Sequence, residues 1–526
     1  MGIFYLGIEL GSTRIKSVLT NEKFEPVAIG GHVWENRLED GVWTYRLDDV
    51  WSGLRDSYAD MAADFKKRQG KEVTNVRGIG ISAMMHGYLP LDKEGEPLAE
   101  FRTWRNTNTQ DAAHKLTELF DFNIPLRWSI AHLYQAILNG ESHVKDISLI
   151  TTLSGYVHYK LTGKKVLGVG DASGMFPIDT DLGVSKTGEF SLHRKMVKSF
   201  DSLDTPLSGS LVDIMPRVLS AGTDAGHLTE EGAKLLDPTG SLKPGIKFCP
   251  PEGDAGTGMA ATNSVEIKTG NVSAGTSIFA MLVLEKSLKE RHPVIDMVTT
   301  PDGKPVAMVH CNNGNSDMDA WISLFAEGSE ILNPGKKTDK SDVYEKLFNE
   351  ALKAETDAGG LMAINYLSGE HNTGFEEGRP LFVRHPSAKL TMANFMRTML
   401  YSSMATLKLG MDVLTVYEGV QLAKLYGHGG FFAVKGPGQK LMASALNVPV
   451  AVMETANEGG AWGIALLAAY MDSGLKSLGE FLEQRVFGGN TGKVEMPNPD
   501  DIEGFKVFME RYKKGLLVER AAVDHL

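Results

Sequence analysis

Cysteine is almost missing from this chain of 526 residues, which contains only Cys249 and Cys311, far apart in the sequence. A disulfide scaffold and a CxxC metal site are therefore both excluded. Two nucleotide and metal motifs are also absent, since there is no GxxxxGK[ST] string and no HExxH occurs among the 14 histidines. These absences exclude P-loop nucleotide hydrolases and zincin metalloproteases.

Long hydrophobic runs and an excess of basic charge are lacking as well. The apolar stretch 459–471 falls short of the ~20 residues that a membrane span needs. The N-terminus has no basic segment, and Glu9 interrupts its apolar run, which is typical of a strand rather than a signal peptide. A net charge of −12 argues against nucleic acids and anionic membranes as partners, although a local phosphate pocket remains compatible with it. We expect a cytoplasmic protein.

Glycine, by contrast, is abundant. The chain has 57 glycines, about 11% against a usual ~7%, while its 42% hydrophobic and 23% charged residues are ordinary for a globular protein. The length predicts two to four domains. The glycines gather in short islands between apolar segments, an arrangement that brings backbone close to a ligand.

Short apolar runs and amphipathic stretches alternate in the first part of the chain. Residues 3–9 and 14–20 predict two strands joined by a tight turn, LGST at 10–13. Residues 47–68 predict a helix, because apolar side chains recur at helical spacing between acids at the start and bases at the end. Residues 76–83 return to strand. This alternation predicts an α/β fold.

The opening pattern returns half a chain later. Residues 265–285 again have the pattern of a strand, a small-residue turn (AGTS at 274–277) and a strand. The pair of hairpins suggests two similar domains, although two unrelated hairpins would look alike in sequence. The segment 237–254 is rich in proline and glycine, and the expected boundary there gives domains of residues 1–252 and 253–526.

The last part of the chain predicts further buried elements. Residues 395–414 have the pattern of a helix whose methionines and leucines face a core. Residues 422–450 predict a strand, a glycine island, a helix and a strand. Residues 454–470 predict a buried helix that starts at a glycine pair.

One string is similar to a dinucleotide-binding fingerprint. Residues 256–261 match GxGxxA, which requires a preceding strand and an acid about 20 residues later. Pro250 and Pro251 interrupt the strand, and Glu266 comes too soon. The dehydrogenase interpretation is therefore disfavoured.

The first turn has the chemistry of a phosphate cradle. Gly11, Ser12 and Thr13 offer backbone N–H groups and two hydroxyls, with Arg14 and Lys16 just beyond. Arg14 and Lys16 could equally be solvated charges on a strand.

Two acids stand beside glycine turns. Glu9 and Asp254 are placed to interact with Mg²⁺ or with a substrate proton. Asp254 is also expected to be a helix N-cap, a role compatible with catalysis, because the residues after it have the pattern of a helix start.

The order of the motifs resembles the FGGY carbohydrate kinases over essentially the whole chain. The glycine turn at 10–13 is followed by MHG at 85–87, GDAGTG at 253–258, AGTS at 274–277 and GHGG at 427–430. The resemblance implies an α/β protein of two ribonuclease-H-like (actin-like ATPase) domains that close over ATP and a sugar in the cleft between them.

The same resemblance assigns the ATP contacts. GIELGSTRIK at 7–16 is similar to the first phosphate hairpin of the family, and AGTS is similar to the second. The glycine pair in GHGG matches an adenosine loop. The implied ATP-binding residues are Gly11, Ser12, Thr13, Arg14, Lys16, Gly275, Thr276, Gly429 and Gly430.

The sugar and metal sites follow from the resemblance in the same way. Met85, His86 and Gly87 look like the xylulokinase sugar loop, and Asp254 matches the catalytic base of the family. Asp254 is also expected to contact the substrate and the metal ion. A lone histidine such as His86 can also be structural. The family has Asp where this chain has Glu9, which is one methylene longer, so Mg²⁺ contact through water is expected. GKK–GDASG at 163–174 resembles another segment of the first domain.

Two departures bear on the substrate. Xylulokinases follow MHG with a WNDxR stretch, whereas this chain has Trp104 followed by Arg-Asn-Thr-Asn, so Trp104 is expected either to stack on the sugar or to lie in the core. The adenosine region, ending in LNVP, instead resembles ribulokinases. The sequence predicts an ATP-dependent and Mg²⁺-dependent kinase of a ketopentose, with a possible homodimer. The alternatives are a kinase of another sugar or polyol and an actin-like ATP-binding protein without kinase activity.

Overall fold

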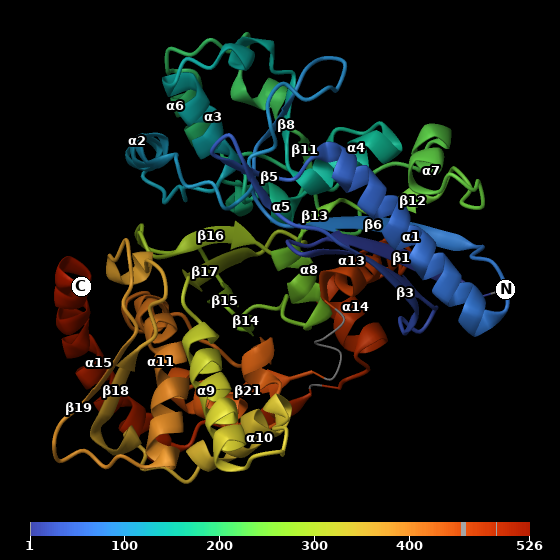
Figure 1. Ribbon diagram of the computed structural model, residues 1–526. Helices are drawn as coiled ribbons and strands as arrows, with labels where there is room; N and C mark the ends of the chain where they lie inside the picture. Colours follow the sequence, from blue (N-terminus) through green and yellow to red (C-terminus); the bar gives the residue numbers. More distant parts are fainter. Residues whose placement is uncertain (1, 454–458, 491) are drawn as a thin grey trace.

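The computed structural model describes residues 2–453, 459–490 and 492–526. Two α/β halves, each built on its own sheet, form the molecule, with the N-terminal half at the top and right of Figure 1 and the C-terminal half below. Cys249 and Cys311 are both buried and unpaired. Among the described residues, no helix is both long and apolar enough to cross a bilayer.

The N-terminal sheet is built around the predicted first hairpin. β1 (Phe4–Leu10) pairs antiparallel with β2 (Arg14–Thr20), which pairs with β3 (Pro26–Val33). β6 (Val76–Ala83) lies parallel to β1, and β12 (Lys247–Phe248) continues the sheet beyond β6. The predicted helix is α1 (Leu47–Gln69), which packs so closely on β3 that a Cβ on Gly30 would lie 2.2 Å from the Met61 nitrogen.

The C-terminal sheet repeats this order. β14 (Gly270–Ala274) and β15 (Ile278–Val283) form the second predicted hairpin, and β17 (Pro305–Cys311) pairs with β15. β20 (Leu425–His428) lies parallel to β14, followed by β21 (Val450–Val452). The two hairpins thus hold equivalent places in two similar sheets, which confirms the internal repeat and the two-domain fold class.

Alternation along β15 divides its side chains between two environments. Ile278, Ala280 and Leu282 are buried in the core of the C-terminal half, together with side chains of α11 (Met392–Asp412). Phe279 and Met281 point the other way and pack in a second hydrophobic cluster, which combines side chains of both halves. One face of the second sheet therefore looks toward the first domain.

Two helices at the centre join the halves. α8 (Asp254–Ala261) and α13 (Gly459–Tyr470) pack together, and α13 also covers β1 and β6, beside which it lies in Figure 1. A Cβ on Gly463 would lie 2.1 Å from the Thr257 carbonyl oxygen. The predicted glycine-started helix is thereby confirmed from residue 459; residues 454–458 lie outside the described part. The GxGxxA string lies inside α8, which removes the dinucleotide fingerprint.

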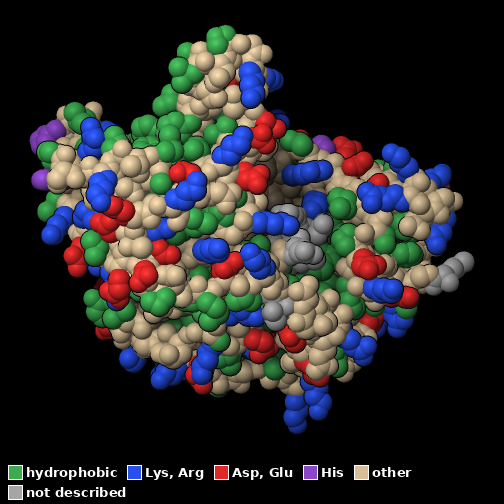
Figure 2. Space-filling view, turned by 90° about the horizontal axis from the view of Figure 1, so that it is seen from below, with side chains coloured by type: hydrophobic (Ala, Val, Ile, Leu, Met, Phe, Trp, Pro, Cys, Tyr) green, Lys and Arg blue, Asp and Glu red, His purple; other side chains and the backbone are tan. Residues whose placement is uncertain are grey.

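Further elements complete each half. In the N-terminal half these are β4 (Arg37–Glu39), β5 (Val42–Thr44), β7 (Leu89–Leu91), α2 (Gln110–Phe120), α3 (Ser129–Leu138), β8 (Leu149–Thr151), α4 (Leu153–Thr162), β9 (Val166–Gly168), α5 (Val169–Ala172), β10 (Glu189–Phe190), α6 (Arg194–Asp201), β11 (Arg217–Leu219), α7 (Glu230–Leu236) and β13 (Glu252–Gly253). In the C-terminal half they are β16 (Asp296–Thr299), α9 (Ser316–Leu332), α10 (Lys340–Ala351), β18 (Leu361–Ile364), β19 (Leu381–Arg384), α12 (Pro437–Leu446), α14 (Leu478–Phe481), β22 (Lys493–Glu495) and α15 (Pro499–His525). Figure 2 shows acidic and basic side chains interspersed over one face of the molecule.

Candidate active site

Asp254 is the first residue of α8, directly after the short strand β13 that runs parallel to β6. The N-cap is Gly253, so the N-cap role expected for Asp254 is wrong, although the carboxylate still lies in the first turn of the helix. Its Oδ1 accepts hydrogen bonds from the backbone N–H groups of Met85, at 3.1 Å, and Ala255, at 2.9 Å. The residue is exposed to solvent, but protein surrounds its carboxyl group on most sides. The resulting loss of solvation raises the pKa of this carboxyl group.

The loop after β6 presents His86 beside Asp254. Met84 donates its backbone N–H to the Leu10 carbonyl, and His86 and Gly87 then adopt left-handed conformations, with φ of 72° and 104°. Such a φ is costly for a residue with a side chain, and it recurs at ligand sites. The bond from Met85 to Asp254 fixes the acid and the loop at 84–87, the predicted sugar loop, relative to each other.

The His86 ring is held in one protonation state. The ring is 6% exposed, and burial lowers its pKa well below the usual range, so the imidazole is neutral. Its Nδ1 lies 3.2 Å from the Gly174 carbonyl oxygen, which can only accept, so Nδ1 carries the proton and Nε2 is an acceptor. A Cβ on Gly174 would lie 2.6 Å from Nδ1, so the last glycine of GDASG leaves room for the ring.

Trp104 lies near the same loop but not in the core. The backbone of Tyr88 exchanges two hydrogen bonds with Arg102, at 2.9 and 3.1 Å, which ties the segment before Trp104 to the sugar loop. The Trp104 side chain is 39% exposed, so the core alternative is wrong. Its stacking on a sugar remains a prediction.

The first hairpin, which is predicted to bind phosphate, is anchored through its backbone and has an exposed tip. Trp34 Nε1 donates to the Gly11 carbonyl at 2.7 Å, and the Tyr45 hydroxyl donates to the Ser12 carbonyl at 2.6 Å. Ser12 and Thr13 are exposed, which leaves their hydroxyls open to a ligand.

The two basic residues beyond this hairpin differ in placement. The Arg14 guanidinium lies over Gly31 of β3, where a Cβ would be 2.3 Å from Nη2, as expected for a charge on the strand surface. Lys16 stands opposite Glu9 in the β1–β2 register, nearer to the acids.

Glu9 connects the first sheet to α13. Its Oε2 accepts a hydrogen bond from the Ala461 backbone N–H, at 3.2 Å, in the first turn of α13. Burial and the nearby charge of Asp254 raise the pKa of Glu9 to about 7, although the Ala461 N–H and Lys16 oppose the shift. Glu9 and Asp254 are thus neighbouring oxygen donors of like charge, a pair that a hydrated Mg²⁺ fits.

The second hairpin and the glycine pair meet at the end of the C-terminal sheet. Asn315 donates its backbone N–H to the Gly275 carbonyl at 2.8 Å, and Thr276 at the tip is exposed. A Cβ on Gly429, whose φ is 96°, would lie 2.5 Å from the Ala274 carbonyl oxygen. Gly429 and the exposed Gly430 therefore lie directly beside the hairpin, as an ATP site made of both would require.

Sequence reasoning missed two buried acids behind Asp254. The hydroxyls of Thr152 and Ser154 donate to Asp171 Oδ2 at 2.7 and 2.6 Å, and the Asp171 N–H donates to Glu252 at 2.9 Å. Burial, with a smaller contribution from a neighbouring acid, raises the pKa of Asp171 to about 7 and that of Glu252 to about 8. The neighbouring acid is Asp254 for Asp171 and Asp171 for Glu252. GDASG was a visible signal for Asp171, whereas nothing local indicated the burial of Glu252.

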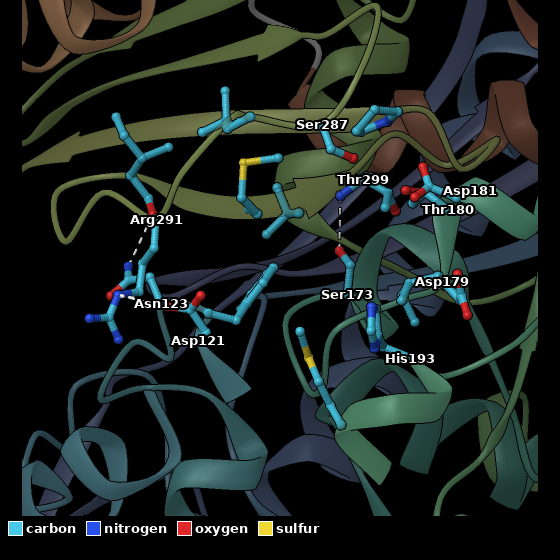
Figure 3. Close-up of a pocket in the computed structure, with 18 of the residues that line it drawn as sticks. Asp121, Asn123, Ser173, Asp179, Thr180, Asp181, His193, Ser287, Arg291 and Thr299 are labelled. Atoms are coloured by element: carbon cyan, nitrogen blue, oxygen red, sulfur yellow. Dashed lines mark hydrogen bonds and ion pairs between the residues drawn. The ribbon is translucent and has the colours of Figure 1, made fainter. Parts of the chain in front are cut away.

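A separate cavity of about 340 Å³ lies between the halves and is lined by none of the predicted site residues. Figure 3 shows Asp121, Asn123 and Arg291 at one end and Asp179, Thr180 and His193 at the other. The Thr299 N–H donates to Ser173 Oγ at 3.0 Å in its wall. Glu290 and His292, which line this cavity, form a group of possible metal ligands with Glu418, whose Oε1 lies 2.6 Å from His292 Nε2.

The two sheets of like order, each with a hairpin in the equivalent place, define the actin-like ATPase fold. Family models of the FGGY carbohydrate kinases match the chain in both halves, the N-terminal domain over residues 4–240 and the C-terminal domain over residues 270–471. The chain belongs to the FGGY family of carbohydrate kinases.

Several relatives carry the names of pentose kinases. The chain is 22% identical to a xylulose kinase of Haemophilus influenzae over 97% of this chain and 98% of the relative. It is 24% identical to a ribulokinase of Geobacillus thermodenitrificans, over 85% of this chain and 81% of the relative. A solved structure named as a xyloylose kinase from Brucella ovis superposes with a TM-score of 0.77 at 18% identity, covering 99% of this chain and all (100%) of that one. Other matches are named gluconokinase and glycerol kinase, so the family shows a carbohydrate kinase without fixing the sugar.

Proposed function

We propose that this carbohydrate kinase transfers the γ-phosphoryl group of ATP to a hydroxyl of a ketopentose of the xylulose or ribulose type. The proposal is supported by one observation above all, the direct bond between Asp254 and the backbone of the sugar loop. That bond holds a solvent-accessible carboxylate beside Met85, His86 and Gly87. The names of the pentose-kinase relatives support the same class of sugar.

Asp254 would accept the proton of the sugar hydroxyl as that hydroxyl attacks phosphorus. A carboxylate with a raised pKa is a stronger base than a solvated one, and general-base catalysis typically contributes ~10²–10⁴-fold. His86 Nε2, as an acceptor, would receive a hydrogen bond from another sugar hydroxyl and so orient the chain.

The phosphates would lie between the two hairpins. The exposed tips at Ser12, Thr13 and Thr276 would donate N–H and O–H groups to them, and Gly429 and Gly430 would admit the nucleotide. Glu9 and Asp254 would hold Mg²⁺ through water, and the cation would neutralise phosphate charge. Phosphoryl transfer relies mainly on such positioning and charge stabilisation.

Membership of the family disfavours an ATP-binding protein without kinase activity. A kinase of another sugar or polyol is kept as the second candidate, because relatives named gluconokinase and glycerol kinase have sequences or folds similar to this chain. D-xylulose, L-ribulose, D-gluconate and glycerol therefore form the minimal substrate panel.

The test is ADP release coupled to each of these acceptors, with wild-type protein and Asp254→Asn. We expect the largest kcat/KM with a ketopentose, and a loss of ~10² or more in Asp254→Asn with nucleotide affinity retained. Asp342→Asn, an exposed acid on α10, is the matched control. Turnover of Asp254→Asn within a few-fold of wild type would remove Asp254 from the mechanism, and a clear preference for gluconate or glycerol would replace the ketopentose.

A further inference from the structure

Three aromatic rings form a row on the C-terminal sheet. The Phe279 and His310 rings are 6.1 Å apart with an interplanar angle of 22°, and His310 and His371 are 6.2 Å apart at 18°. They come from three elements, β15, β17 and the short 3-10 helix at His371–Thr373. We call them the ring row.

The ring row is built into the backbone rather than formed by loose side chains. Phe279 and His310 face each other directly in the β15–β17 register, where side chains of opposed residues pack in contact. Asn372 donates its side-chain N–H to the His310 carbonyl, which ties the third ring to β17. The fully buried Glu370 accepts hydrogen bonds from the backbone and side chain of Asn313, both at 3.2 Å, which fixes the segment before His371.

The ring row faces the N-terminal half and the sugar loop. Phe279 packs against a hydrophobic cluster that includes Met85 of the sugar loop together with side chains of both halves, on the sheet face opposite to the core of its own domain. Burial lowers the pKa of His86, His310 and His371, and the charge of Arg127 lowers each further, so all three imidazoles lie within reach of the charge of that guanidinium. Arg127 is itself paired with Asp296 of β16, an ion pair between the halves.

The direction of the row relates it to the reaction. Phe279 lies three residues beyond Thr276 at the hairpin tip, whereas His371 is at the other end of the row, with a side chain that is 47% exposed. The phosphoryl group would arrive from the hairpin end, beside Asp254. The outer rings therefore lie farther from the reacting hydroxyl than Phe279 does.

We infer that His310 and His371 are sugar-binding residues that contact the hydroxyls remote from the one phosphorylated, opposite His86. This inference rests on the proposed function and adds to it the wall contributed by the C-terminal domain. Each neutral imidazole offers one donor and one acceptor, which suits hydroxyl groups. With Arg127 already neutralised by Asp296, the row recognises an uncharged polyhydroxylated chain rather than a sugar carboxylate.

The test measures sugar binding and turnover in His310 and His371 variants. In His310→Ala and His371→Ala we expect the Kd and KM for the ketopentose to rise about tenfold, with the KM for ATP unchanged. Dihydroxyacetone, which lacks the remote hydroxyls, should lose less than threefold in kcat/KM. His310→Gln and His371→Gln, which keep a hydrogen-bonding group, should lie closer to wild type than the Ala variants.

Three comparisons make the outcome decisive. His525→Ala, an exposed histidine at the end of α15, controls for loss of an imidazole elsewhere. Wild-type sugar affinity in both Ala variants, or full rescue by His310→Phe and His371→Phe, would overturn the inference while leaving the ketopentose kinase intact. If the wild type instead prefers D-gluconate, both the proposed substrate and the recognition of an uncharged chain are wrong.

Discussion

His86 shows how one residue combines backbone strain, burial and a defined tautomer. Its φ of 72° and its bond to the Gly174 carbonyl hold the ring between the sugar loop and GDASG. A histidine that served only to fill the core would not need a left-handed backbone, nor an acceptor nitrogen that has no hydrogen-bond donor among the described residues. The geometry therefore favours the sugar contact over the purely structural alternative.

Replacing this ring tests that assignment. His86→Ala should raise the sugar KM by roughly tenfold to a hundredfold, because a hydrogen bond in a desolvated site contributes about 1.5–3 kcal/mol. The KM for ATP should stay the same. Thermal unfolding of the same preparation provides the comparison: a large loss of stability with a normal sugar KM would identify His86 as a core residue.

The residues that sequence reasoning missed share one property. The pairing of Asp171 with Glu252, and of Phe279 with His310, depends on strands and helices that meet from distant parts of the chain. Asp254 and His86 could be identified from the sequence because each lies in a short motif that resembles the FGGY family. For Glu9, the sequence predicted its place beside the first glycine turn but not the hydrogen bond that it accepts from Ala461.

At the scale of elements, local pattern was a good guide. The expected strands at 14–20 and 76–83 coincide with β2 and β6, and the helix at 47–68 differs from α1 by one residue. These segments carry their own periodicity and end signals. The packing of α13 on α8 could not be predicted, because a glycine in the sequence does not say which backbone approaches it.

That packing gives a prediction for α13. Gly463→Ala should destabilise the protein by about 1–3 kcal/mol, because the new Cβ would meet the Thr257 carbonyl oxygen at 2.1 Å and backbone cannot yield easily. Turnover should fall too, since Thr257 lies one turn after Asp254. Differential scanning calorimetry and coupled ADP release measure the two effects.

Gly328→Ala in α9 is the matched control. Its Cβ would meet nothing within 4 Å, so the change should stabilise the helix by about 0.5–1 kcal/mol. Equal melting temperatures for the two variants would mean that α13 does not press on α8 as described.

For the molecule as a whole, histidines that are buried in the neutral state make the free energy of unfolding fall at acid pH. Burial lowers the pKa of His158 to about 4, and its Nε2 lies 3.1 Å from the Ala225 carbonyl. The unfolded chain binds this proton near pH 6.5, so stability is present at neutral pH and is lost as pH falls from 6.5 toward 4.

His158→Gln should flatten this limb of the stability curve. Gln can still donate to Ala225 but does not titrate, so the variant should lose about 2 kcal/mol less than wild type between pH 7 and pH 5. Urea unfolding at the two pH values measures the difference, with His525→Gln as the exposed control. An unchanged difference would show that His158 titrates normally in the folded state.

Two expectations about the whole molecule remain predictions. One is the homodimer, which would need a surface that binds a second copy of the chain. The other is the domain boundary near residue 252, which was placed from the sequence alone. In space, α13 comes from well beyond that boundary and yet covers β1 and β6 of the first sheet.

The position of α13, which follows the boundary in sequence but covers the first sheet, has a practical consequence for dividing this enzyme into two complementing fragments. A piece that stops near residue 252 would leave one face of β1 and β6 uncovered, with Gly7 and Gly80 offering bare backbone where Ala461 and Ile464 belong. Such a piece would tend to aggregate before its counterpart arrived. A workable split reporter would have to leave β1, α8 and α13 able to assemble in one step, for instance by circular permutation that joins the C-terminal segment directly to the first strand.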